Sequence, residues 1–405
     1  MSESIKTRFL IICVICTVVA GVVGVQMIRI QNTEPAQRLL AAGENYQGVT
    51  RVVYPDRGNI YDSKGRLLAG NETSYEIGLD LNSVTQPETV ASIASSVLGL
   101  DYTQTLGYAQ MTPGNGNPYY IVLDDFVDED KIVELETIKA DYNSREARGN
   151  VVLPSISGLM WTPHSQRAYP EGTLAANILG FYSYLDRTGG NGYFGLEEAY
   201  DSQLSGTPQA VFYAFDPQRL STVEEIPPGV TLILTLNREI QAMTEKQLDQ
   251  AIEWSGAEGG TIVVYDPEDG GVIAMATTPR LDPNEYWDYS ELFPNPMPYN
   301  SAISQTYEPG SVFKVLTMAA ALDSGTVDVD TRFNDTGAYH IGGHTVYNWN
   351  HGGWGDVSMT ECMQYSLNVC MTWLAVEMGP DTFYSYLKAF GLDRKTGIDL
   401  GGENS

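Results

Sequence analysis

The chain has 405 residues, of which 43% are hydrophobic, so it is large enough for two or three domains with proper cores and is not a largely disordered protein. Asp and Glu outnumber Lys and Arg by 51 to 23, which gives a formal net charge of −28. Such a charge repels phosphate backbones and anionic lipid headgroups, so nucleic acid is not expected as a partner.

The first predicted element is an apolar span at residues 9–28, FLIICVICTVVAGVVGVQMI, which contains no charged residue. A run of about 20 apolar residues can cross a bilayer, and this one lacks the small-residue cleavage site of a secretory signal. We therefore expect a retained transmembrane anchor, with residues 1–8 as a cytoplasmic tail. Basic residues lie on both sides of the span, so the positive-inside signal for this orientation is weak.

The cysteines lead to one expectation about the external part of the chain. Cys13 and Cys16 lie within the span, which leaves only Cys362 and Cys370 outside it. On one continuous helix, the rise per residue would separate these two by about 12 Å, which is too far for a disulfide. The external part is therefore expected to rely on packing alone.

Two domains are predicted beyond the span. Residues 57–80, RGNIYDSKGRLLAGNETSYEIGLD, alternate as two strands around a Ser-Lys-Gly turn, which predicts a β-hairpin. A helical region and a compact Gly- and Tyr-rich unit at 167–206 follow. The Pro-rich stretch EEIPPGV at 224–230 is the best domain boundary. We predict a mixed α/β domain at 29–226 and a second domain at 227–405.

The second domain has the pattern of a sheet packed against helices, an α+β fold. A strand leads into an amphipathic helix at residues 231–256, and 260–279, GTIVVYDPEDGGVIAMATTP, is typical of a hairpin. Residues 311–322, SVFKVLTMAAAL, predict a helix with apolar side chains on every side, the pattern of a buried element. Another largely apolar helix is predicted at 358–379.

A nucleophile and a possible base lie together at the start of the 311–322 helix. Ser311 and Lys314 are three residues apart, so their side chains share one face of the helix. A serine hydroxyl becomes reactive when a base takes its proton, and burial in an apolar surround lowers the pKa of a lysine so that it can be neutral. The helix N-terminus adds partial positive charge where an oxyanion would develop. Lys314 is therefore a candidate catalytic base.

Ser-x-x-Lys is also common by chance. Ser311 could simply cap the helix while Lys314 extends to water. A second match at Ser385 and Lys388 lies on an amphipathic helix, where we interpret the lysine as a surface residue.

Two further polar residues strengthen the assignment of Ser311. Ser366 and Asn368, in YSLN, lie inside the apolar 358–379 run, and a buried hydroxyl and a buried amide need hydrogen-bond partners. The alternative is that neighbouring backbone satisfies both, but beside a serine-lysine pair a shared site is favoured.

A metal site is not expected. His340, His344 and His351 cluster in a Gly-rich stretch, where they are interpreted as ordinary loop residues, and there is no HExxH pair.

The ordered set of motifs resembles the class B penicillin-binding proteins, membrane-anchored serine D,D-transpeptidases of peptidoglycan synthesis. Besides the anchor, the stretches that carry the resemblance are RGNIYDSKGRLLA, RAYPEGTLAANILG, GYFGLEEAYDSQLSG, IVVYDPEDGGVIAMA, EPGSVFK and YSLN.

The resemblance implies a role for each site residue. Ser311 would be the acylated nucleophile, Lys314 its base, Ser366 a proton relay and Asn368 a ligand of the substrate's peptide backbone. It also implies peptidoglycan stem peptides ending in D-Ala-D-Ala as substrate, β-lactams as covalent inhibitors, other cell-wall synthesis proteins as partners, and no cofactor.

The resemblance extends to architecture and location. A dimerisation-type pedestal at 29–226 would hold a serine transpeptidase/β-lactamase-like domain, an antiparallel sheet flanked by helices, outside the bacterial cell membrane on a single-pass anchor.

The sequence departs from the family pattern in three places. Leu367 stands where the family usually has a smaller residue, and Asn177 where it more often has histidine. The third motif, Lys-Thr/Ser-Gly, is matched only at Lys395, in a turn directly after a helix. The family also has this phrase well before its catalytic motif, so we interpret Lys395 as a decoy and not as the catalytic lysine. Residues 227–405 are therefore expected to be the N-terminal part of an incomplete transpeptidase domain.

Two alternative functions remain open. The chain could be a β-lactam hydrolase or sensor, or, if it is truncated, a non-catalytic scaffold of the cell-wall machinery.

Overall fold

The structure of the protein is a computed structural model. It describes residues 17–19, 21–27, 29, 33, 48–114, 116–145, 153–186, 189–214, 226–294 and 297–404. Half of the membrane span predicted at 9–28 lies outside these residues. In the part of the chain that is described, no helix is both long enough and apolar enough to cross a bilayer.

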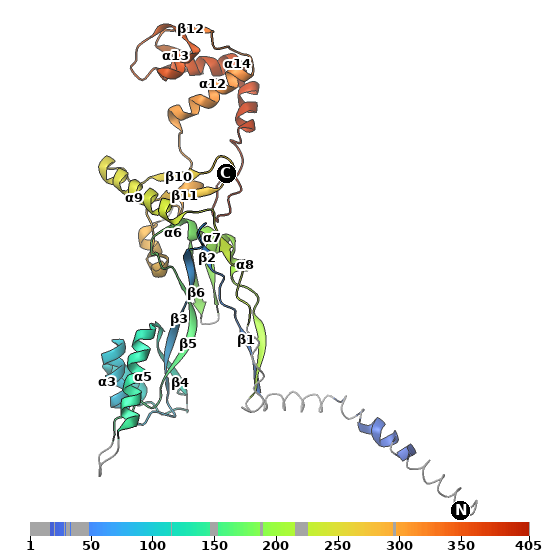
Figure 1. The fold of residues 1–405 in the computed structure, drawn as a ribbon, viewed down its shortest axis with the longest axis vertical. Helices are drawn as coiled ribbons and strands as arrows, with labels where there is room; N and C mark the ends of the chain where they lie inside the picture. Colours follow the sequence, from blue (N-terminus) through green and yellow to red (C-terminus); the bar gives the residue numbers. More distant parts are fainter. Residues whose placement is uncertain are drawn as a thin grey trace, which may run out of the picture. The chain divides into compact units, whose positions relative to one another are not determined.

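The chain divides into two compact units, each built from several chain segments. The first unit comprises residues 1–59, 70–167 and 202–232, and the second comprises 60–69, 168–201 and 233–405. Many of their elements are labelled in Figure 1.

The first unit is a helix-covered sheet with a separate strand pair. Residues 75–80 of β3 (Leu67–Asp80) pair antiparallel with β4 (Tyr120–Val127), and β5 (Leu159–Ala168) also pairs with β3. Its core includes the fully buried Ile77, Leu79, Val90 and Leu135 from the sheet and its helices. The other elements are β1 (Gly48–Val53) paired with β8 (Gln209–Ala214), α3 (Pro87–Leu98), α4 (Tyr102–Ala109) and α5 (Glu129–Ser144).

The second unit begins with short elements and an aromatic cluster. The hairpin predicted at 57–80 is confirmed, because β2 (Ile60–Tyr61) pairs with the start of β3. Phe181, Phe293 and Tyr299 pack together in one small core. The short elements here are β6 (Phe181–Asp186), β7 (Gly189–Tyr193), β9 (Leu232–Ile233), α6 (Ala176–Leu179), α7 (Gly195–Ala199), α8 (Asp201–Leu204), η2 (Pro283–Asp288), α10 (Tyr289–Leu292) and α11 (Ser301–Ser304).

The hairpin and amphipathic helix predicted for the second domain are also confirmed. Strands β10 (Thr261–Tyr265) and β11 (Val272–Thr277) pair antiparallel, and α9 (Arg238–Ser255) packs on β11. The buried Gln241 fixes this packing: its Nε2 donates to the Met275 carbonyl at 2.7 Å and its Oε1 accepts from the Met275 N–H at 2.8 Å. A side-chain amide thereby satisfies backbone groups of β11 that would otherwise be buried without partners.

The 311–322 helix is only partly buried, so the prediction of an apolar helix covered on every side is wrong for one face. A 3-10 turn, η3 (Gly310–Phe313), precedes α12 (Lys314–Asp323). Ala320 and Ala321 are fully buried, whereas Val312 is 70% and Val315 58% exposed. The reason is that α12 packs against α13 (Met359–Gln364) and α14 (Asn368–Ala389), which cover one side of it.

The apolar helix predicted at 358–379 is interrupted. It forms α13 and α14, separated by Tyr365, Ser366 and Leu367. Ser366 adopts a left-handed conformation, with φ of 53°, and Leu367 is fully buried. The chain therefore turns between the two helices, which a periodic apolar pattern does not reveal.

This turn also overturns the expectation about the cysteines. With the helix broken, the Cα atoms of Cys362 and Cys370 lie 6.0 Å apart and the two form a disulfide. The straight-helix separation on which the expectation rested does not apply.

The remaining strands form two small antiparallel pairs beside these helices. They are β12 (Arg332–Asp335) with β15 (Gly355–Ser358), and β13 (Ala338–Ile341) with β14 (His344–Tyr347). His340 and His344 lie on the second pair. Among the described residues, no group of three His, Cys, Asp or Glu side chains is placed to hold a metal ion.

Candidate active site

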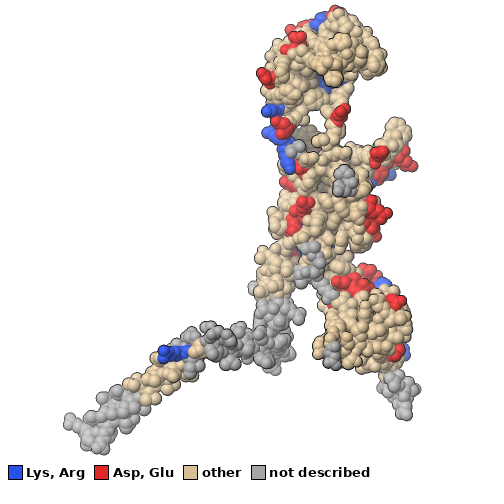
Figure 2. All heavy atoms as spheres, turned by 180° about the vertical axis from the view of Figure 1, so that it is seen from behind, with Lys and Arg blue, Asp and Glu red and all other residues tan. Residues whose placement is uncertain are grey.

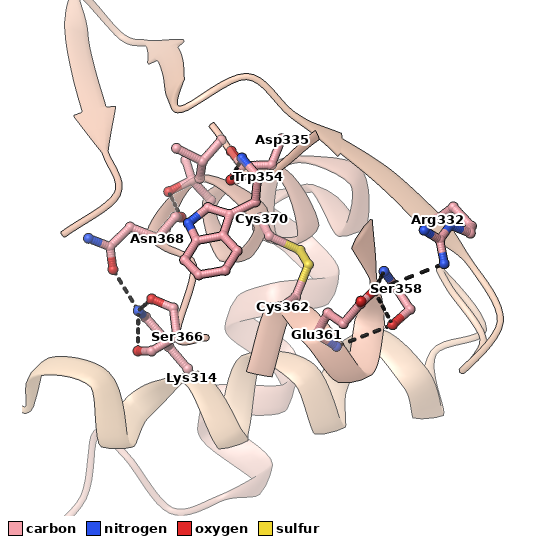
Figure 3. The surroundings of a disulfide bond; sticks show 12 residues. Lys314, Arg332, Asp335, Trp354, Ser358, Glu361, Cys362, Ser366, Asn368 and Cys370 are labelled. Carbon is pink, nitrogen blue, oxygen red and sulfur yellow. Dashed lines mark hydrogen bonds and ion pairs between the residues drawn. A yellow bond between two sulfur atoms is a disulfide. The ribbon is translucent and has the colours of Figure 1, made fainter. Parts of the chain in front are cut away.

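The four candidate residues named from the sequence come together in the structure. The Lys314 Nζ donates to the Ser366 carbonyl at 2.7 Å, to the Ser366 Oγ at 2.9 Å and to the Asn368 Oδ1 at 2.6 Å (Figure 3). Three oxygen acceptors thus surround the Lys314 Nζ, and residues 52 and 54 positions further along the chain meet it here.

Ser311 joins the group through Ser366. The Ser366 Oγ donates to the Ser311 Oγ at 3.1 Å, so the connection from Ser311 to Lys314 passes through the Ser366 hydroxyl. Hydroxyl groups can both donate and accept, so this chain can carry a proton in either direction. Ser311 itself is exposed, so its hydroxyl can be reached from the solvent.

Burial changes the acidity of Lys314. The side chain is half-buried beside α14, and this desolvation lowers the pKa of its amine below the usual lysine range. A larger fraction of the amine is therefore neutral near pH 7 than for an exposed lysine, which is what a general base requires.

The conformation of Ser366 is set by neighbours from the 347–354 segment. The Trp349 Nε1 donates to the Tyr365 carbonyl at 3.2 Å, and the Trp354 ring stacks on the Tyr365 ring with centroids 4.4 Å apart. On the other side of the turn, the Asn368 Nδ2 donates to the Tyr347 carbonyl at 2.9 Å, leaving its Oδ1 directed at Lys314. The turn is thus fixed before and after Ser366.

Asn348 is a supporting residue that the sequence interpretation missed. Its Oδ1 accepts from the Val369 N–H at 3.1 Å, which caps the start of α14, and its Nδ2 donates to the Asp335 Oδ2 at 2.7 Å. Both Asn348 and Asp335 are almost fully buried. The available signal was an asparagine pair, Asn-Trp-Asn, in a loop between predicted elements, but nothing in the sequence showed which partner it would meet.

The second Ser-x-x-Lys match and the Lys395 decoy make hydrogen bonds with other partners. Ser385 Oγ donates to the Thr382 carbonyl at 2.7 Å, and the Lys388 side chain is 69% exposed, as expected of a surface residue. The Lys395 Nζ donates to the Glu403 carbonyl at 2.7 Å, within an exposed turn.

The two other departures from the family pattern contribute no atom to the site. Leu367 is fully buried in the core. Asn177 is also buried, where its Nδ2 donates to the carbonyls of Pro279, at 3.1 Å, and Tyr299.

Ser366 offers a test that separates chemistry from backbone strain. A left-handed conformation raises the free energy of a residue with a Cβ by about 1 to 2 kcal/mol, whereas glycine adopts it without this strain. Ser366→Gly is therefore expected to be about 1 kcal/mol more stable than Ser366→Ala, while both lose the hydroxyl and with it the relay. Urea denaturation gives the stabilities and penicillin acylation gives the rates. An alanine variant that acylates at the wild-type rate would contradict the relay.

Comparison with known proteins supports the same assignment over most of the chain. The family described as penicillin-binding protein dimerisation domain matches residues 52–229, and the family described as penicillin binding protein transpeptidase domain matches residues 260–405. The chain belongs to the class B penicillin-binding proteins. The transpeptidase match contains all four residues of the site.

Individual relatives of this class B penicillin-binding protein point the same way. Stage V sporulation protein D of Bacillus subtilis is 28% identical over 87% of this chain and 52% of that protein. Penicillin-binding protein PbpB of Mycolicibacterium smegmatis is 35% identical over 59% of this chain and 37% of that protein. Peptidoglycan D,D-transpeptidase MrdA of Escherichia coli is 25% identical over 87% of this chain and 57% of that protein.

The fold is also that of a solved family structure. The chain resembles Penicillin Binding Protein 2X from Streptococcus thermophilus with a TM-score of 0.68 and 24% identity, covering 88% of this chain and 54% of that one. The α+β fold predicted from the sequence is therefore that of a penicillin-binding protein. The chain spans about half the length of the first relatives and of the structure that it matches.

Proposed function

We propose that the protein is a peptidoglycan D,D-transpeptidase that acts through an acyl-enzyme on Ser311. The observation that supports this most directly is the hydrogen-bonded series from Lys314 through Ser366 to Ser311. A serine hydroxyl connected to a lysine of lowered pKa can be deprotonated as it attacks a carbonyl. The substrate proposed is a stem peptide ending in D-Ala-D-Ala, and one relative that supports this choice is named peptidoglycan D,D-transpeptidase MrdA.

In the first half-reaction, Ser311 Oγ bonds to the carbonyl carbon of the penultimate D-Ala. Its proton passes to the Ser366 Oγ, whose own proton passes to the neutral Lys314 Nζ. The carbon–nitrogen bond to the terminal D-Ala then breaks, and the leaving amine takes a proton back along the same path. The products are free D-Ala and an ester on Ser311.

In the second half-reaction, an amine of a neighbouring stem peptide attacks the ester carbonyl. Its proton enters the same relay, and Ser311 leaves with a proton, which restores the starting state and forms one new peptide bond. Asn368, whose Nδ2 and Oδ1 hold Tyr347 and Lys314, is the group proposed to meet the substrate's backbone as it enters.

The rest of the chain is proposed to place this site at the outer face of the bacterial cell membrane. Residues 9–28 would be the anchor, 29–226 the pedestal, and 227–405 the transpeptidase domain. Other cell-wall synthesis proteins are proposed partners of the pedestal.

Acidic side chains are numerous on the face shown in Figure 2, and basic ones are fewer there, which is in keeping with the net charge of −28.

The experiment is to incubate the protein with a stem peptide ending in D-Ala-D-Ala and a second peptide that supplies the amine. Mass spectrometry should detect free D-Ala and a cross-linked product in equal amounts, and an intact-mass increase on Ser311 with penicillin. Rapid release of hydrolysed penicillin would instead support a β-lactam hydrolase. Absence of both D-Ala release and any adduct would support a non-catalytic scaffold.

A further inference from the structure

The Cys362–Cys370 disulfide spans the turn at residues 365–367 between α13 and α14. The proposed mechanism uses Ser366 in this turn, but it assigns no role to the disulfide. Ser366, Leu367 and Asn368 all lie between the two cysteines, and the bond links α13 to α14 across the turn (Figure 3). Both cysteines are fully buried in the core that also contains Leu367 and Leu374. The disulfide is thus part of the hydrophobic core that packs against the turn.

The segment before the turn has little stability of its own. Helix α13 is only six residues long, and a helix of that length does not persist without tertiary support. A capping box holds its first turn: the Ser358 Oγ accepts from the Glu361 N–H at 3.2 Å, and the Glu361 Oε2 accepts from the Ser358 N–H at 2.7 Å. The disulfide, four residues before Ser366, is the covalent hold on the helix near its other end.

The turn itself must keep an unfavourable conformation. Ser366 has a φ of 53°, and its main-chain N–H donates to the Met363 carbonyl at 3.1 Å, while the Leu367 N–H donates to the Cys362 carbonyl at 2.9 Å. The Cys362 residue therefore supports the turn twice, through its carbonyl and through its sulfur. A shift of α13 relative to α14 would move the Ser366 Oγ, which has to reach Ser311 and Lys314 together.

We propose that Cys362 and Cys370 are positioning residues, whose disulfide holds Ser366 and Asn368 in register with Lys314 for acylation. The proposal rests on the proposed acyl-transfer function. The bond forms when the two thiols give up two protons and two electrons to a dithiol–disulfide oxidant, which is itself reduced to its dithiol. The outer side of the membrane, where the site is proposed to act, is an oxidising environment in which such bonds persist.

The test measures pre-steady-state acylation by a fluorescent penicillin in the wild type and in two double variants, Cys362→Ser with Cys370→Ser and Cys362→Ala with Cys370→Val. Rate against penicillin concentration gives the acylation rate constant separately from the initial binding constant, and the amplitude gives the fraction of competent protein. Leu374→Val, in the same core but outside the turn, is the matched control for lost packing.

Both double variants are expected to lose about 10- to 100-fold in the acylation rate constant, the range that a misplaced catalytic group costs, at nearly full amplitude. Leu374→Val should lower the melting temperature but keep the rate constant. Peptide mapping of the unreduced wild type should show Cys362 joined to Cys370.

Three results would overturn the proposal. One is an unchanged rate constant with a reduced amplitude, because that marks a purely structural bond. Another is two free thiols at these positions in the wild type. If the wild type forms no adduct at Ser311, the proposed function fails as well, and peptide mapping then still shows whether the bond itself exists.

Discussion

Ser311→Ala is expected to abolish covalent labelling of the protein by a fluorescent penicillin. The alanine variant has no oxygen at the exposed position that the Lys314–Ser366 relay reaches, so no ester can form there. Labelling intensity on a denaturing gel and intact mass after a long incubation should both fall to background. The fold should survive, because Ser311 lies exposed in a short 3-10 turn and its side chain fills no part of the core.

The chain supplies a matched control for this variant. Ser385 and Lys388 have the same spacing as Ser311 and Lys314, but Ser385 donates to a backbone carbonyl of its own helix and Lys388 is mostly in water. Ser385→Ala should therefore label at the wild-type rate. Labelling that survives in the Ser311 variant, or disappears in the Ser385 variant, would place the nucleophile elsewhere.

The meeting of the site residues could be predicted from the sequence because they break a local pattern. Lys314 is the only charge in an apolar run, and Ser366 and Asn368 are polar residues in another, so each needs a partner wherever the chain places it. The need of a buried polar group for a hydrogen-bond partner can be inferred from the sequence alone. It predicted which residues meet, but not the order of the hydrogen bonds, because in the structure Ser311 is connected to Lys314 through Ser366.

The geometry that supports the site could not be predicted in the same way. Hydrophobic periodicity continues unchanged through the residues 365–367, so it indicates one helix where the structure has two. The break depends on a left-handed serine and on contacts from a distant loop, such as the Trp349 bond to the Tyr365 carbonyl. The disulfide was missed for the same reason, since its feasibility depends on the break.

The exposed face of α12 illustrates a second limit. Apolar residues on all sides of a helix favour complete burial, but the side chains of Val312 and Val315 are exposed to solvent in the structure. A pattern of side chains reports what a helix can bury, whereas the neighbours present in the fold decide which face is covered.

Lys314→Arg should be nearly as damaging to acylation as Lys314→Ala. A guanidinium keeps positive charge but does not give up its proton at any relevant pH, so it cannot accept the proton of Ser311 through Ser366. Loss of a general base costs about 100- to 10,000-fold, and both variants should fall in this range. The measurement is the second-order acylation rate constant for each variant, with circular dichroism to confirm that both are folded.

The pH dependence of the wild type provides the complementary test. Burial lowers the pKa of Lys314, which means that the neutral amine appears at a lower pH than for an exposed lysine. The acylation rate should therefore rise with pH until Lys314 has lost its proton and then level off, with the inflection below the ordinary lysine pKa. The arginine variant should lack this inflection, because its group does not titrate in the range. If that variant acylated at close to the wild-type rate, Lys314 would supply only positive charge, and the proton of Ser311 would have to leave by another path.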